Sequence, residues 1–212
     1  MDLVEIVETI HGELPYMGLP CLLVRFAGCN LKCPYCDTNF EKRFEKPTER
    51  VAEFINSSRL PSVLLTGGEP LLQKEFETLV SLIRKDIQVV VETNGSILIP
   101  ETLYGNVTWV IDVKLHESMK NIELLNLPLA TVGDVFKFVF WDERSFDDAL
   151  EFTKTYQNKV SWGVNWVFSP THELVVKKKI EKYVAEIISL QKEVEHRKIW
   201  FQTQIHKILG VK

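Results

Sequence analysis

The stretch Cys29-Asn30-Leu31-Lys32-Cys33-Pro34-Tyr35-Cys36-Asp37-Thr38 follows directly after a short apolar run, residues 22–26. Its cysteines have the spacing C-x3-C-x2-C, so three thiols lie on one loop at the end of a predicted buried strand. Thiolates bind zinc, copper(I) and iron–sulfur clusters, and a complete 4Fe-4S site usually takes four cysteines. Three thiolates leave one iron open, and an open position allows a bound metal to take part in chemistry. We therefore predict a reactive metal centre on this loop.

The position of the fourth cysteine and the overall composition indicate a single-domain protein that binds neither nucleic acid nor membranes. Cys21 lies just before the same predicted strand, whose length separates it from the other three. The 212 residues are 45% hydrophobic and no linker interrupts them, so we expect one domain over 1–212. A net charge of −4 argues against the basic surface that nucleic-acid binding needs. Without a signal peptide or a run of roughly 20 apolar residues, the chain is expected to be cytoplasmic and free of membrane partners.

Apolar runs and amphipathic segments alternate along the rest of the chain. The predicted strands cover 3–10 (peripheral), 22–26, 63–66, 87–92, 107–113, 135–140, 162–168 and a short run at 199–202. The predicted helices cover 48–55 with Thr48 as the cap, 76–83, 117–127, 147–156 and 174–194. Such alternation predicts a parallel sheet with right-handed crossovers. Six βα units are fewer than the eight of a closed barrel, so we predict an α/β fold, an open partial barrel.

Residues of chemical interest come just after the predicted strands. They are the three cysteines, Gly67-Gly68-Glu69-Pro70, Thr93-Asn94-Gly95, Lys114 and Ser169-Pro170. Parallel strands bring their carboxyl ends to one rim, so we expect these residues to converge on one site. Taken alone, the Gly-Gly-Glu-Pro segment also fits a strand-to-helix turn, and Thr93–Gly95 fits an Asn-Gly turn. Lys114 also fits a solvated surface lysine.

The cysteine spacing followed by Gly67-Gly68-Glu69-Pro70 resembles the radical S-adenosylmethionine (SAM) superfamily, whose fold is a partial barrel. The resemblance implies a 4Fe-4S cluster on Cys29, Cys33 and Cys36, with SAM bound to the open iron and cleaved to a 5′-deoxyadenosyl radical. It also implies contacts to SAM from further residues. These are Gly67, Gly68 and Glu69 at its amino group, Glu92, Thr93 and Asn94 near its ribose, and Lys114 at its carboxylate.

Longer motifs resemble the 7-carboxy-7-deazaguanine synthase family over nearly the whole chain. They are Thr9-Ile10-His11-Gly12-Glu13, Cys36-Asp37-Thr38, the segment 66–73, Glu92-Thr93-Asn94-Gly95 and the tail Gln204-Ile205-His206-Lys207. The resemblance implies a lyase that converts 6-carboxy-5,6,7,8-tetrahydropterin to 7-carboxy-7-deazaguanine with loss of ammonia, on the route to queuosine. It implies SAM and Mg2+ as cofactors, a homodimer, and a flavodoxin or ferredoxin-type electron donor.

The substrate of that family suits particular side chains of this one. A buried carboxylate such as Glu13 fits the donors on the pyrimidine edge of the pterin, and a guanidinium such as Arg25 fits its carboxylate. By resemblance, Thr38 binds Mg2+, and the backbone near Thr66 and Gly68 completes the pocket with His206 from the tail. Arg25 also fits a structural ion pair, and His206 a surface residue.

One position departs from the family, which usually has Gln-Gly-Glu-Gly where this chain has His11-Gly12-Glu13-Leu14. We expect His11 to contact the substrate here. An imidazole lacks the paired donor and acceptor of an amide, so its contact differs in kind.

Two alternatives to the pterin enzyme are open. A glycyl-radical-enzyme activase of the anaerobic ribonucleotide reductase type shares the cysteine spacing and a similar length, but the candidate pocket residues favour a small substrate. A non-catalytic zinc module would take a fourth ligand from Cys21 or a histidine. Zinc sites more often combine two close cysteines with a distant second pair, which this sequence lacks.

Overall fold

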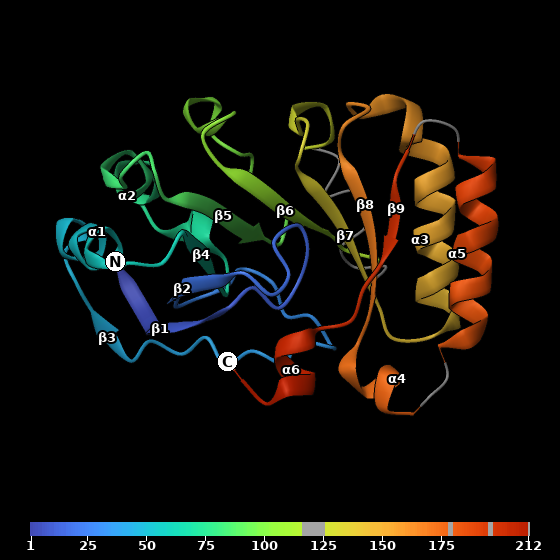
Figure 1. Cartoon of the computed structure of the whole chain (residues 1–212), viewed down its shortest axis with the longest axis horizontal. Coiled ribbons are helices and arrows are strands. Elements are labelled where there is room, and N and C mark those ends of the chain that lie inside the picture. Colours follow the sequence, from blue (N-terminus) through green and yellow to red (C-terminus); the bar gives the residue numbers. More distant parts are fainter. Residues whose placement is uncertain (116–125, 178–179, 195–196, 212) are drawn as a thin grey trace.

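The computed structural model describes residues 1–115, 126–177, 180–194 and 197–211. Its strands form one sheet in the order β3-β1-β2-β4-β5-β6-β7-β8-β9, with β3 and β9 at the two open edges (Figure 1). The strands are β1 (Asp2–Ile10), β2 (Pro20–Phe26), β3 (Phe44–Glu45), β4 (Ser62–Gly67), β5 (Gln88–Thr93), β6 (Thr108–Val113), β7 (Val135–Phe140), β8 (Asn165–Pro170) and β9 (Ile199–Phe201). From β2 to β9 every pairing is parallel, whereas β1 and β3 pair antiparallel. The predicted open, mostly parallel α/β fold is confirmed.

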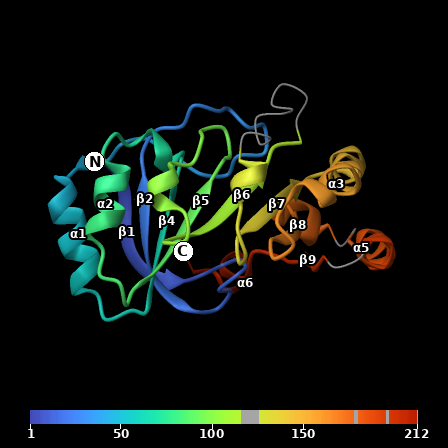
Figure 2. The same cartoon turned by 90° about the horizontal axis from the view of Figure 1, so that it is seen from above.

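Four helices, α1, α2, α3 and α5, pack on the outer face of this sheet. Seen from above, α1 and α2 lie at the end of the sheet near β1 and β4, and α3 and α5 lie at the end near β7–β9 (Figure 2). The helices are α1 (Thr48–Ser57), α2 (Phe76–Leu82), α3 (Glu143–Tyr156), α4 (His172–Val176), α5 (Glu181–Glu193) and α6 (Ile205–Leu209), with short 3-10 turns at Pro70–Leu72, Glu101–Leu103, Leu127–Leu129 and Gln157–Lys159. No helix in the described ranges is long and apolar enough to cross a bilayer.

Three helix predictions need comment. The single helix expected over 174–194 is wrong, because α4 and α5 are separate helices, and Ile188 of α5 is 54% exposed. The buried stripe of α5 is instead Tyr183, Ile187 and Leu190, at spacings of four and three. Thr48 is not the cap of α1, since Pro47 precedes the helix and the Thr48 hydroxyl donates to Glu75. The helix expected over 117–127 lies outside the described residues except at its last two positions.

The inner face of the sheet has two layers, which follow from the alternation of side chains along each strand. The inner apolar layer consists of Leu23, Leu64, Val90, Val110, Val135 and Val167, which pack together with Cys21. Two residues further along each strand lies a polar side chain, and we call these six the polar layer: Arg25, Thr66, Glu92, Asp112, Lys137 and Ser169. The outward-facing residues of the same strands join the helices in the main apolar core. The polar layer therefore lies at the carboxyl ends of the parallel strands, on the face opposite α1, α2, α3 and α5.

Candidate active site

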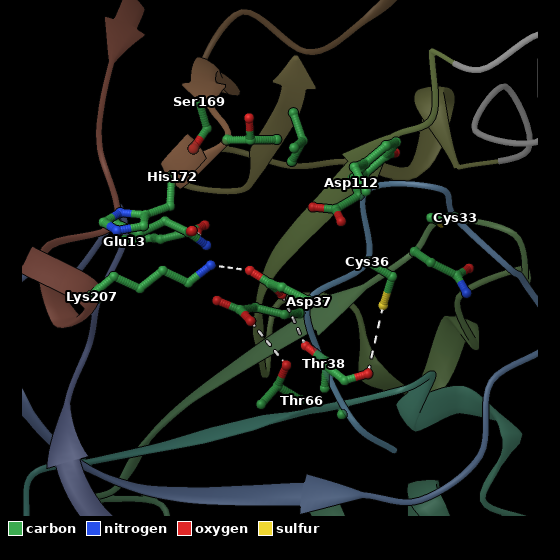
Figure 3. A pocket seen from close by; sticks show the side chains of 18 of the residues that line it. Glu13, Cys33, Cys36, Asp37, Thr38, Thr66, Asp112, Ser169, His172 and Lys207 are labelled. Carbon is green, nitrogen blue, oxygen red and sulfur yellow. Dashed lines mark hydrogen bonds and ion pairs between the residues drawn. The ribbon is translucent and has the colours of Figure 1, made fainter. Parts of the chain in front are cut away.

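A cavity of about 880 Å³ opens at the carboxyl ends of the strands, and all six members of the polar layer line it. Figure 3 shows this cavity with three of them, Thr66, Asp112 and Ser169, labelled. The sequence-predicted residues that also line it are Glu13, Cys29, Cys33, Cys36, Thr38, Gly67, Gly68, Thr93, Asn94, Lys114 and His206, together with Ser169-Pro170. The predicted convergence of these loops on one site is thus confirmed. Glu69 and His11 are not among the residues that line the cavity.

The cysteine loop presents all three thiols to this cavity. The amide of Leu31 and the side-chain amide of Asn94 donate to Sγ of Cys29, at 3.5 and 3.7 Å, as suits a sulfur that carries negative charge. Cys21, by contrast, is fully buried on the inner apolar layer, where burial and then the charge of Glu92 raise the pKa of its thiol to about 12. It is therefore not a fourth member of the group, as expected.

An aromatic stack holds the cysteine loop against the sheet. The ring of Tyr35 stacks on Trp141, just after β7, with centroids 4.5 Å apart and planes at 21°. The Tyr35 ring also makes a cation–π contact, because Nζ of Lys114 lies over it at 5.8 Å from the ring centroid. Neither aromatic residue was singled out from the sequence, because the contact joins positions more than a hundred residues apart.

The thiols fit a cluster better than a single ion. Among the described residues, no group of three or more His, Cys, Asp or Glu side chains is arranged to hold one metal ion. In a 4Fe-4S cluster each cysteine binds a different iron, so the sulfurs need not meet at one point. Three thiols lining one cavity, with N–H groups directed at one of them, match that requirement.

The Gly-Gly-Glu-Pro loop packs against the backbone at the end of β2. A Cβ on Gly67, whose φ is +145°, would lie 2.3 Å from the carbonyl oxygen of Phe26, and one on Gly68 would lie 1.9 Å from that of Gly28. The amide of Glu69 also donates to the Gly28 carbonyl at 2.9 Å. Both glycines are therefore required to bring this loop beside the cysteine loop.

The Glu69 carboxylate is directed inward rather than into the cavity. It is fully buried and accepts from the Thr93 hydroxyl and the Asn94 amide at 2.8 Å each, and from the Leu71 amide at 3.0 Å. Burial raises the pKa of this carboxyl, opposed by those donors. Its position differs from the expected contact with SAM: the side chain ties the loop to the end of β5.

Glu92, Asp112 and Lys137 carry charge within the polar layer. Oε2 of Glu92 accepts from the Thr66 hydroxyl at 2.9 Å, and burial raises the pKa of Glu92. Asp112 bridges two lysines, with Nζ of Lys114 at 2.7 Å and Nζ of Lys137 at 3.1 Å. Asp112 and Lys137 were missed from the sequence, where the available signal was one charged residue within an otherwise apolar strand.

The candidate substrate residues come from both ends of the chain. Glu13 is buried and binds Nζ of Lys137 at 2.8 Å, Nε2 of Gln204 at 2.7 Å and Nε2 of Gln202 at 3.3 Å. Nε of Arg25 donates to Glu5 at 2.9 Å while the side chain lines the cavity, so the ion pair and the cavity position occur together.

The C-terminal helix α6 reaches the same region. His206 lies directly over Gly12, where an added Cβ would come within 1.7 Å of its Nδ1, and burial lowers the pKa of this imidazole. The next residue, Lys207, forms an ion pair with Asp37 of the cysteine loop, beside the half-buried Thr38 (Figure 3). His206 is thus a half-buried cavity residue and not a surface one.

His11 occupies a different environment from Glu13. It is 3% exposed, and its Nε2 lies 2.8 Å from the hydroxyl of Ser62, the first residue of β4 and therefore at the opposite end of that strand from the cavity rim. Burial lowers the pKa of His11 to about 4, so the imidazole is neutral. The structure does not bring this residue to the cavity.

Comparison with known proteins agrees with this geometry. A family model described as the radical SAM superfamily matches residues 23–160. The 7-carboxy-7-deazaguanine synthase of Clostridium acetobutylicum is 31% identical and covers 97% of this chain and 94% of its own; that of Archaeoglobus fulgidus is 31% identical and covers 100% and 99%. The crystal structure of QueE from Escherichia coli shares the fold, with a TM-score of 0.68 at 19% identity over 95% of this chain and 93% of that one. The chain therefore belongs to the radical SAM superfamily and, within it, to the 7-carboxy-7-deazaguanine synthase family.

Proposed function

We propose that this chain is a lyase that contracts the ring of 6-carboxy-5,6,7,8-tetrahydropterin to give 7-carboxy-7-deazaguanine, with loss of ammonia. The observation that carries the proposal is that one cavity is lined both by the three cysteines and by Glu13, Arg25 and His206. Its volume of about 880 Å³ lies in the upper part of the range for ligand sites, which leaves room for SAM and a bicyclic substrate together.

Superfamily membership brings a 4Fe-4S cluster and SAM as cofactors. When bound, they supply the 5′-deoxyadenosyl radical that removes a hydrogen atom from the substrate. We assign Cys29, Cys33 and Cys36 to the cluster, and the backbone of Gly67 and Gly68 to the SAM amino group. Lys114 is assigned to the SAM carboxylate, and Glu92, Thr93 and Asn94 to the region of the ribose. Glu69 supports that region through its bonds to Thr93 and Asn94.

The residues at the substrate side of the cavity would bind the pterin through hydrogen bonds. The buried Glu13 carboxylate accepts from the N–H groups of the pterin, and the planar guanidinium of Arg25, held by Glu5, binds its carboxylate. His206 is a neutral imidazole at pH 7 because burial lowers its pKa, so it can donate or accept without adding charge. The N-terminal strand and the C-terminal tail would in this way complete one substrate pocket within a single domain.

Further assignments are also proposals. Thr38 would supply the protein ligand to Mg2+, with substrate and water filling the other positions, since Mg2+ prefers oxygen ligands and retains several waters. A flavodoxin or ferredoxin-type protein would deliver the electron. The enzyme would work as a homodimer in the cytoplasm, where a reducing environment preserves the thiols.

The deciding experiment mixes anaerobically reconstituted, reduced protein with SAM, Mg2+ and the carboxytetrahydropterin, and measures 7-carboxy-7-deazaguanine, ammonia and 5′-deoxyadenosine. Omitting Mg2+, and replacing Thr38 by Val, should each lower product formation. If SAM is cleaved but no deazaguanine forms, the substrate assignment is rejected and the activase alternative gains support. One zinc without iron or sulfide in the purified protein would reject the radical chemistry altogether.

A further inference from the structure

Lys137 is an unusual residue at its position in the fold. It lies in the middle of β7 between Phe136 and Phe138, both fully buried, and its side chain turns to the inner face. Asp112 is its register partner on β6, at 3.1 Å, and Glu13 lies 2.8 Å away on the other side. A buried ammonium group between two carboxylates is costly to desolvate unless its geometry is maintained, so this placement calls for a role.

The protonation state limits that role. Burial lowers the pKa of Lys137, but the carboxylates of Asp112, Glu13 and Glu92 more than offset it and hold the pKa well above its usual value. Lys114, a second cation beside Asp112, is paired with that carboxylate at 2.7 Å. Lys137 is therefore an ammonium ion throughout the range in which enzymes work, which argues against a base or an amine nucleophile.

The partners of Glu13 show what the ammonium group does. The other two side chains that bind this carboxylate, Gln202 and Gln204, come from the segment after β9 and are neutral. Lys137 is thus the cation in direct contact with Glu13 among the described residues, and it is carried by a central strand instead of a loop. Positions on strands are held more firmly than positions on loops, as a site that orients a substrate requires.

We propose that Lys137 is a positioning residue of the enzyme, anchored by Asp112, that holds the Glu13 carboxylate in the orientation and charge that bind the pterin. This inference rests on the proposed function. Lys137 would act through Glu13 and would not itself remove or deliver a hydrogen or a proton.

The test compares Lys137→Met with Lys154→Met, which removes the exposed ion pair between Lys154 and Glu193. Because removal of one partner of a buried charge pair is expensive, Lys137→Met should raise the KM for the pterin by roughly 30-fold or more. Iron content should stay near the wild-type value, and Lys154→Met should change neither the iron content nor the KM. An unaltered KM in the cluster-loaded Lys137→Met enzyme would overturn the proposal.

A double-mutant cycle shows whether Lys137 acts through Glu13. In a Glu13→Gln background, the further change Lys137→Met should raise the KM by no more than about twofold, because the carboxylate that it positions is gone. Additive effects would show that Lys137 acts independently and would contradict the proposal. Should Met at position 137 prevent folding, Lys137→Arg keeps the charge with a different shape and should still raise the KM by about tenfold, and an unchanged KM would again count against the idea. Wild-type enzyme that makes no deazaguanine would reject the proposed function itself, whereas active wild type with unaffected variants would reject only the role of Lys137.

Discussion

The two faces of the sheet are built from the same strands but by different chemistry. On the outer face, aromatic side chains pack densely: the Phe138 and Trp166 rings lie 5.6 Å apart, Phe140 and Phe146 5.0 Å, and Phe146 and Tyr183 4.7 Å. On the inner face, small apolar residues lie below a layer of charged and hydroxyl groups. The outer face therefore provides stability and the inner face provides chemistry. Because successive side chains along a strand point to opposite faces, neighbouring residues of one strand serve these two different purposes.

Loss of a cysteine should have the largest effect on the inner face. Replacing Cys33 by Ala removes one of three thiols, and we expect SAM cleavage, measured as 5′-deoxyadenosine, to disappear. The matched control is Cys21→Ala, which changes a buried thiol of the inner apolar layer and should leave SAM cleavage intact. If Cys33→Ala still cleaved SAM, or if both variants lost cleavage equally, Cys33 could not be assigned as a cluster ligand and Cys21 as a core residue.

Replacing a large residue of the outer-face core should lower stability but leave turnover largely intact, the opposite of the cysteine replacement. Phe146→Ala, on α3, should lower the free energy of unfolding by about 3–5 kcal/mol because it leaves a cavity among buried rings. Turnover per loaded cluster should stay within about threefold at a temperature where the variant is folded, since the residue lies on the outer face. Phe54→Ala, at a half-exposed position on α1, should cost within about 1 kcal/mol in the same urea titration. Phe146→Ala that is stable but inactive would break the comparison.

Glu69 tests the boundary between the faces. Glu69→Gln replaces one carboxylate oxygen by an amide that meets donors from Thr93, Asn94 or Leu71, so we expect a loss of about 1–3 kcal/mol in unfolding free energy. The exposed Glu53, paired with Arg50 on α1, is the control, and Glu53→Gln should cost less than about 1 kcal/mol. Equal stability of Glu69→Gln and wild type would mean that this carboxylate does not hold the loop.

The smallest expected effect is a dependence of stability on pH. Burial raises the pKa of Glu92 above its ordinary 4.5, so its contribution to stability is fully present below pH 4.5 and is lost as pH rises through the folded-state value. Glu92→Gln resembles the protonated form and removes this loss. The unfolding free energy of Glu92→Gln relative to wild type should therefore increase from pH 4.5 upward, as measured by urea titration at several pH values. If the difference in unfolding free energy between Glu92→Gln and wild type did not vary with pH, the raised pKa of Glu92 would be contradicted.

Much of the fold follows from local patterns, whereas parts of the site do not. Apolar runs separated by amphipathic helices correctly indicated the parallel strands, and residues after the strands correctly indicated the rim of the cavity. Asp112 and Lys137 were missed because their strands were treated as uniformly apolar, although the alternation of side chains places a lone charge on one face. The inward turn of Glu69 and the bonds from Gln202 and Gln204 to Glu13 depend on contacts between distant segments, which no local pattern contains.

The close approach of His206 to Gly12 has a consequence for how the protein is made. The three cysteines are synthesised long before Gln202 and Gln204, which bind Glu13, and before the imidazole of His206 over Gly12. A nascent chain can therefore expose its three cluster-binding cysteines before the residues that complete the pocket have been synthesised.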